Sequence, residues 1–115
     1  MVPFRGDPVQ QPVTSDEWIA VTDEDTFHDK PLWSPDGRLL YFTSDQDGYR
    51  CIWAQRLDPN TKRPVGSPFA VYHSHSARRS LLNADILKLE LAVAPGKLVF
   101  QLGEITGNIW MATLR

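Results

Sequence analysis

A short turn-and-strand pattern that occurs twice constrains the fold of this chain more than any other feature. Residues 33–42 read Trp-Ser-Pro-Asp-Gly-Arg-Leu-Leu-Tyr-Phe, and residues 93–101 repeat the proline, the glycine, a basic residue and apolar residues in the same order, with one deletion. A glycine turn and an Ile-Trp strand follow each copy, at residues 52–53 and 109–110. The copies lie about 57 to 60 residues apart, somewhat more than the β-propeller repeats of about 40 to 50 residues. The pattern predicts a protein built from repeated antiparallel units.

Turn residues bound the apolar runs of the first copy. A tight hairpin turn is predicted at Ser34, Pro35, Asp36 and Gly37. The proline ring fixes φ at the second position, and the glycine can adopt a positive φ at the last. A second turn is predicted at Asp45, Asp47 and Gly48. The runs 39–42 and 51–54 are apolar on both faces, which is typical of strands that are covered on each side. No long segment shows the 3.6-residue period of a helix.

We therefore expect an all-β fold of antiparallel four-stranded β-propeller blades, an incomplete propeller of about two blades plus strands of a preceding one. One complete blade is expected over residues 31–73, with strands near 31–33, 39–44, 50–57 and 68–72. Residues 1–30 would hold a connector and two end strands of the preceding blade, at 2–4 and 18–22. Residues 74–88 would form a connector with a short helical turn, and residues 89–115 a three-stranded last blade with strands near 89–94, 97–102 and 108–114.

These residues resemble the blades of TolB-like propellers, a WD-repeat-like bacterial family. A blade of that family reads approximately Pro-x-Trp-Ser-Pro-Asp-Gly, an apolar strand, Ser-Asp-x-Asp-Gly and an Ile-Tyr or Ile-Trp strand. The match is close over residues 29–57 and looser over 89–114, where Asp36 has no counterpart and the acidic turn is replaced by residues 103–107. Because a propeller closes with about 4 to 8 blades, the resemblance implies either the C-terminal part of a longer protein or a ring completed by self-association through open blade faces.

Charge and hydropathy argue against two classes of partner. The formal net charge is -2 and the pI is about 5.8, so no basic excess predicts binding to nucleic acid. No apolar run approaches the ~20 residues needed to span a bilayer, so we expect no membrane insertion. Cys51 is the only cysteine and excludes an internal disulfide. The compartment stays open; the resemblance is compatible with a periplasmic or extracytoplasmic one.

His73 and His75 are the residues most like a binding site. Residues two apart on a strand share a face, so both imidazoles could bind one metal ion, with His28, Asp29 or Tyr72 as further ligands. Two histidines supply only half of a zinc site, and the sequence does not specify the rest. The simpler interpretation is a pair of histidines near the end of an outer strand that make hydrogen bonds or face solvent. On this interpretation the chain has no metal and no cofactor.

Other polar residues have structural explanations. Arg78 and Arg79 could bind an anion or a carboxylate, or form an ion pair with a residue such as Asp85. The turn at residues 45–48 resembles a calcium loop, but its register lacks the required glutamate. Cys51 lies inside an apolar strand, where a thiol is expected to be inert. No nucleophile elbow is present, so no catalytic residue is predicted.

Large aromatic residues in repeat positions are expected to build the core between blades. These residues are Trp33, Tyr41, Trp53, Phe100 and Trp110. Trp18, which lies outside the repeat, is expected to be partly exposed.

The sequence favours a non-catalytic binding or scaffolding propeller with a protein or peptide partner. One alternative is a sensor or regulatory propeller attached to a kinase, a transcription regulator or a peptidase. A further alternative is a metal-dependent enzyme that uses His73 and His75. Fold alone does not decide between these functions.

Overall fold

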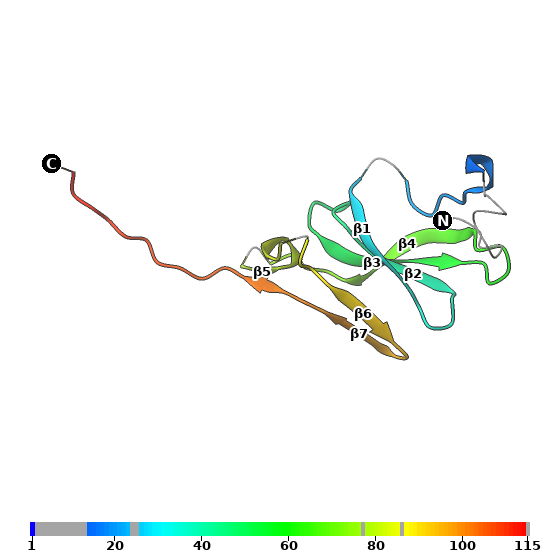
Figure 1. Ribbon diagram of the computed structural model, residues 1–115. Coiled ribbons are helices and arrows are strands. Elements are labelled where there is room, and N and C mark those ends of the chain that lie inside the picture. Colours follow the sequence, from blue (N-terminus) through cyan, green and yellow to red (C-terminus); the bar gives the residue numbers. More distant parts are fainter. Residues whose placement is uncertain (2–13, 24–25, 77, 86, 115) are drawn as a thin grey trace.

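The computed structural model describes residues 1, 14–23, 26–76, 78–85 and 87–114, and these residues form antiparallel β-sheets without an α-helix (Figure 1). The expected all-β class is therefore confirmed. The ordered elements are η1 (Ser15–Glu17), β1 (His28–Trp33), β2 (Leu39–Ser44), β3 (Cys51–Leu57), β4 (Pro64–Tyr72), β5 (Arg79–Ser80), η2 (Leu81–Asn83), β6 (Leu91–Ala94), β7 (Lys97–Phe100) and β8 (Gly103–Glu104).

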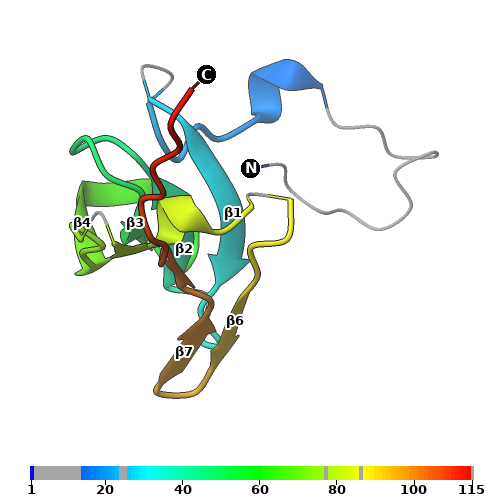
Figure 2. The ribbon, with the colours of Figure 1, turned by 90° about the vertical axis from the view of Figure 1, so that its left-hand side faces the viewer.

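Strands β1 to β4 form one four-stranded sheet in which each strand pairs with its neighbour in sequence. Figure 2 shows this order across the sheet, with β1 and β4 at its two edges. The turn between β1 and β2 depends on Gly37, which adopts a φ of 69° and donates its N–H to the Ser34 carbonyl at 2.9 Å. The Asp36 carboxylate accepts hydrogen bonds from the Ser34 hydroxyl and the Arg38 N–H, which fix the turn from inside.

Strands β1 and β4 begin earlier than the sequence indicated. β1 starts at His28 instead of residue 31, and β4 starts at Pro64 instead of residue 68. Pro64 takes the first position of β4, where a missing N–H costs least, and the buried Gln55 amide donates to the carbonyls of Val65 and Gly66. The Gln55 side chain of β3 therefore binds two backbone carbonyls at the start of β4, which would face water if these residues formed a loop.

The β6–β7 hairpin and the connector after β4 cover part of the four-stranded sheet. Ile52, Leu81 and Leu89 are fully buried and form the core cluster. Partly buried side chains that pack against this cluster are Tyr72, Ala84, Leu91, Leu98 and Phe100. The core thus joins one strand of the sheet to the connector and the hairpin, and β5 pairs with β8 to close the connector.

Two expected strands are absent from the part of the chain that the structure describes. Residues 18–22 lie outside any strand, and the backbone of Ile19 exchanges two hydrogen bonds of 2.9 Å with Met1. Residues 108–114 pair with no neighbour, because β8 pairs with β5 and takes the chain away from β7 (Figure 1). The last blade expected to have three strands is thus a two-stranded hairpin. The strand predicted at 2–4 lies outside the described residues.

Two of the aromatic residues expected between blades are exposed in the structure of this chain. Trp110 is 88% exposed because its segment has no neighbouring strand. Trp33 is 44% exposed because β1 is an edge strand, and its ring contacts the Lys62 ammonium at 5.7 Å. Tyr41 and Trp53 are half-buried, as is Phe100, which packs on the core cluster.

Candidate metal centre

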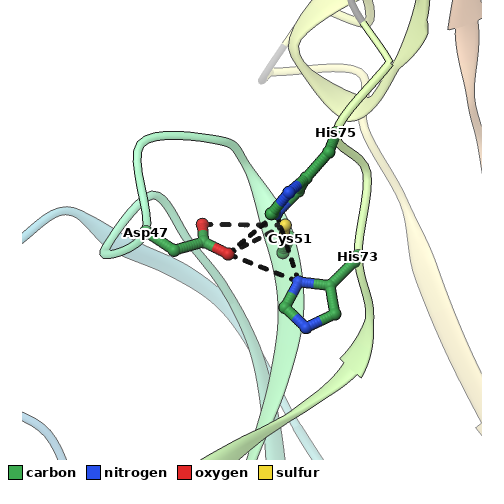
Figure 3. A group of neighbouring side chains, drawn as sticks. All are labelled: Asp47, Cys51, His73 and His75. Carbon is green, nitrogen blue, oxygen red and sulfur yellow. Dashed lines mark hydrogen bonds and ion pairs between the residues drawn. The ribbon is translucent and has the colours of Figure 1, made fainter.

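His73 and His75 lie side by side just after the end of β4. Ser74 between them is buried; its N–H donates to the Cys51 sulfur at 3.3 Å, and its hydroxyl accepts the Leu81 N–H at 3.1 Å. Because Ser74 points inward in an extended segment, both flanking imidazoles point to the opposite side. His73 Nδ1 then lies 3.2 Å from His75 Nε2 (Figure 3).

Asp47 reaches the histidine pair from the turn between β2 and β3. Its Oδ2 lies 2.9 Å from His75 Nε2 and 3.3 Å from His73 Nδ1. Gly48, at a φ of 87°, donates to the Asp45 carbonyl at 2.9 Å and closes the turn. The Tyr49 N–H donates to Asp47 Oδ1 at 3.3 Å, which orients the carboxylate toward the histidines.

Cys51, the first residue of β3, completes the group from the buried side. Its thiol donates to the Asp47 oxygens at 3.7 and 3.8 Å, and its side chain is fully buried. One ligand atom from each of Asp47, Cys51, His73 and His75 lies within 4.8 Å of all the others. We call these four residues the metal cluster.

The spacing of the donor atoms is close to that of a tetrahedral zinc site. Ligands at about 2.0 to 2.3 Å from a tetrahedral Zn²⁺ lie about 3.3 to 3.8 Å from one another. Four of the six separations between its donors are 2.9, 3.2, 3.3 and 3.7 Å, and the other two are no longer than 4.8 Å. Only small shifts of side chains would therefore bring all four donors onto one ion.

The acids in the cluster differ in their tendency to ionise. Burial is the largest influence on Asp47 and raises its pKa, but the hydrogen bonds from His75 and the Tyr49 N–H together leave that pKa below its ordinary value. Burial raises the pKa of the Cys51 thiol, and the Asp47 carboxylate adds to this effect. A bound cation would reverse the cost of the thiolate, since metal coordination deprotonates a thiol.

Two aromatic rings hold the imidazoles. The Tyr49 ring stacks on His75 with centroids 4.4 Å apart and planes at 17°. The Trp53 and His73 rings meet in a T-shaped arrangement, with their centroids 5.9 Å apart. His73 and His75 are still 56% and 45% exposed, so an ion can enter from solvent without an opening of the fold.

The structure changes the set of ligands that the sequence suggested. His28 contacts Asp23 and Thr26, and neither it nor Asp29 nor Tyr72 belongs to the metal cluster. The missing donors, Asp47 and Cys51, were interpreted as a turn residue and an inert thiol. The signal that could have found them is strand register: Ile52 pairs with Tyr72, which sets Cys51 beside His73.

Arg78 and Arg79 lie on the connector and form ion pairs with Glu104. Arg78 Nε lies 3.2 Å from one carboxylate oxygen of Glu104 and Arg79 Nη2 lies 3.0 Å from the other. The expected ion-pair role is thus present with Glu104 in place of Asp85. This bridge holds β8 to β5 and leaves both guanidinium groups already partnered.

An open groove of about 1080 Å³ lies apart from the metal cluster. It runs between residues 18–23 and the face of β1 and β2, and its apolar lining includes Trp18, Trp33, Leu40 and Phe42. Trp18 is exposed, as expected. Among the described residues, no helix has the length and apolar character needed to cross a membrane.

Comparison with known proteins gives no match: no family model, no curated protein and no solved structure is significantly similar to this chain.

Proposed function

We propose that this chain is a non-catalytic binding module of the β-propeller type, and that it binds a Zn²⁺ ion through the metal cluster. The observation that carries the proposal is the convergence of one carboxylate, one thiol and two imidazoles within 4.8 Å. These donors come from the β2–β3 turn, the start of β3 and the segment after β4. Such a convergence from separate elements is what a metal site requires.

The donor set selects the class of metal. A thiolate and two imidazoles suit borderline-soft ions, whereas Ca²⁺ and Mg²⁺ prefer oxygen ligands. Zn²⁺ accepts sulfur, nitrogen and carboxylate oxygen in tetrahedral geometry. The cluster offers all three donor types at distances close to that geometry, so Zn²⁺ is the ion that it fits best.

The number of protein ligands favours a structural role over catalysis. Catalytic zinc sites keep a position open for water or substrate, whereas structural sites use four protein ligands. Four side chains converge here. An ion bound by all of them would tie the β2–β3 turn to the connector, across a sequence separation of 28 between Asp47 and His75. Its binding free energy would then add directly to the stability of the fold.

The same proposal assigns the β1–β4 sheet as one blade of a TolB-like propeller. Its support is the order β1-β2-β3-β4 of a simple meander, together with the glycine turns at Gly37 and Gly48 that the family pattern places there. On this assignment the apolar groove over β1 and β2 is the surface for a protein or peptide partner, because the groove is open and its lining includes the exposed side chains of Trp18 and Trp33.

Cobalt titration tests the metal proposal. Tetrahedral Co²⁺ bound to a thiolate gives visible ligand-field bands and a sulfur charge-transfer band in the ultraviolet. We expect both bands to saturate at one equivalent and to disappear when Zn²⁺ is added. Cys51→Ser should remove the charge-transfer band and His73→Ala should weaken binding by at least about 10-fold. His28→Gln is the matched control and should bind as the unchanged protein does; a featureless titration would contradict the proposal.

A further inference from the structure

Residues 105–114 form an extended segment that carries an unusual density of exposed apolar side chains. We call it the 105–114 segment. Five of its large apolar side chains are between 63 and 101% exposed: Ile105, Ile109, Trp110, Met111 and Leu114. Contiguous apolar surface of this kind marks an interaction site in soluble proteins. The segment therefore requires a partner, and the structure restricts which one.

The direction of the 105–114 segment is fixed at its start. Gly103 and Glu104 pair with β5, and the Ile105 N–H donates to the Arg78 carbonyl at 2.9 Å. The Asn83 amide also donates to the Gly103 carbonyl at 3.1 Å. These contacts direct the segment away from the β6–β7 hairpin of its own chain (Figure 1). In the structure it does not turn back onto β7 of its own chain.

The edge strand β7 offers the matching surface. Within the described residues β7 pairs with β6 alone, so one row of its N–H and C=O groups has no neighbouring strand. Leu98 and Phe100 pack inward on the core cluster, while Val99 points outward and is exposed. An unpaired edge strand with an apolar outer side is a template for one more strand.

The internal repeat identifies the strand that fits this edge. In the first copy, residues 52–57 belong to β3, which pairs antiparallel with β2 over its whole length. In the second copy the counterpart of β2 is β7, and the counterpart of residues 52–57 is 109–114. The 105–114 segment is thus the sequence that the β7 edge is missing, although within one chain of the structure the segment does not lie on that edge.

We propose that the 105–114 segment of one copy pairs as an antiparallel strand with β7 of a second copy, and that the exchange is reciprocal. Reciprocal exchange uses the same two surfaces on both chains and closes as a twofold dimer. The repeat gives the register: Leu40 pairs with Gln55 in the first copy, so Val99 of one chain lies opposite Ala112 of the other. The same register sets Met111 opposite Phe100, so Ile109 and Met111, which are otherwise exposed to water, lie on the face that packs on the core cluster.

Light scattering over a concentration series, with two matched variants, tests this exchange. The unchanged chain of 13.1 kDa should give a dimer mass. In the double variant Met111→Pro/Ala112→Pro, the strand loses backbone donors and the dimer should dissociate to monomers. Met111→Val/Ala112→Val keeps the N–H groups and the strand propensity, so it should remain a dimer. A monomeric unchanged chain, or a dimer that survives the proline substitutions, would overturn the proposal.

Disulfide trapping tests the register separately. Directly opposed residues in an antiparallel pair lie within the Cα distance that a disulfide bridges. The variant Val99→Cys/Ala112→Cys should oxidise to a covalent dimer, whereas Val99→Cys/Thr106→Cys should not. A covalent monomer from the first variant, or equal crosslinking in both, would contradict the exchange; recovery of a different protein bound to the segment in place of a second copy would do the same. None of the substituted residues contacts the metal cluster, so these results are independent of zinc binding.

Discussion

The Cys51 sulfur accepts the backbone N–H of Ser74 at 3.3 Å, and this single contact joins the first residue of β3 to the segment that carries both clustered histidines. A hydrogen bond from a backbone amide stabilises negative charge on sulfur and orients the ligand. The contact therefore sets Cys51 and the two imidazoles around one position before any ion is bound. It explains how an apolar strand can present a thiol to a polar, solvent-open cluster.

Zn²⁺ should raise the stability of the fold through Asp47. An ion that binds only the folded state adds about 2.7 kcal/mol when its concentration is one hundred times Kd. Asp47→Asn removes a charged ligand but keeps an acceptor for the Tyr49 N–H, so most of the added stability should disappear. Thermal unfolding with and without Zn²⁺ measures the difference. Asp45→Asn, in the same turn, should leave the zinc effect intact; an equal loss in both variants would contradict a specific role for Asp47.

Leu81 should be the most sensitive position of the connector. Its side chain is fully buried in the core cluster with Ile52 and Leu89. Leu81→Ala removes that packing and leaves a cavity, so it should lower the free energy of unfolding by about 2 to 5 kcal/mol. Leu82 is next in sequence and 49% exposed. Leu82→Ala should cost far less in chemical denaturation, and similar losses for both would mean that the core is placed wrongly.

The β1–β2 turn should lose stability in acid through Asp36. The Ser34 hydroxyl and the Arg38 N–H, in that order, hold the pKa of the Asp36 carboxyl below its ordinary value of 3.8. The unfolded chain therefore binds the proton more readily than the folded chain. The stabilising contribution is full above the ordinary pKa and is lost as pH falls through the lower pKa of the folded state.

Asp36→Asn should accordingly flatten part of the pH dependence between neutral pH and pH values below 3.8. Denaturant unfolding across that range measures it. Asp45→Asn makes the same change of charge in the next turn and serves as the control. An unchanged pH profile for Asp36→Asn would show that the turn hydrogen bonds do not couple to stability.

Gly103 should tolerate no side chain at the β5–β8 contact. A Cβ added there would lie 2.6 Å from the Asn83 Cβ, whereas one added at Gly107 would meet no atom within 4 Å. Gly103→Ala should therefore disrupt the pairing with β5 and speed hydrogen exchange of the Ile105 amide, which donates to Arg78. Gly107→Ala should leave that amide protected. Equal protection in both variants would contradict the close approach to Asn83.

Local signals in the sequence predicted the β1–β4 sheet well. The proline and glycine at 35 and 37 define the first turn, and the doubly apolar runs define β2 and β3 within about one residue. The second copy was harder, because its strand at 108–114 depends on pairing with β7, and this pairing does not occur within the chain in the structure. The alternation of apolar residues indicates that a segment can form a strand. Whether residues 108–114 pair with β7 depends on the direction that the β5–β8 pairing gives the backbone.

The candidate site was only half predictable for a related reason. The alternation of His73, Ser74 and His75 is local and visible in the sequence. Asp47 and Cys51 come from a turn and a strand more than twenty residues earlier. Only the register of β3 on β4 brings these donors to the histidines, and that register depends on bulges which no local pattern specifies.

Native mass spectrometry of the purified chain with Zn²⁺ tests the central claim most directly, since it counts ions per folded molecule. We predict one tightly bound Zn²⁺ per chain, a Kd of about 1 µM or tighter, and loss of the bound ion in His73→Ala and Cys51→Ser but not in His28→Gln. A chain that binds no zinc, or binds it equally well in all of these variants, would contradict the assignment of Asp47, Cys51, His73 and His75 as a metal centre.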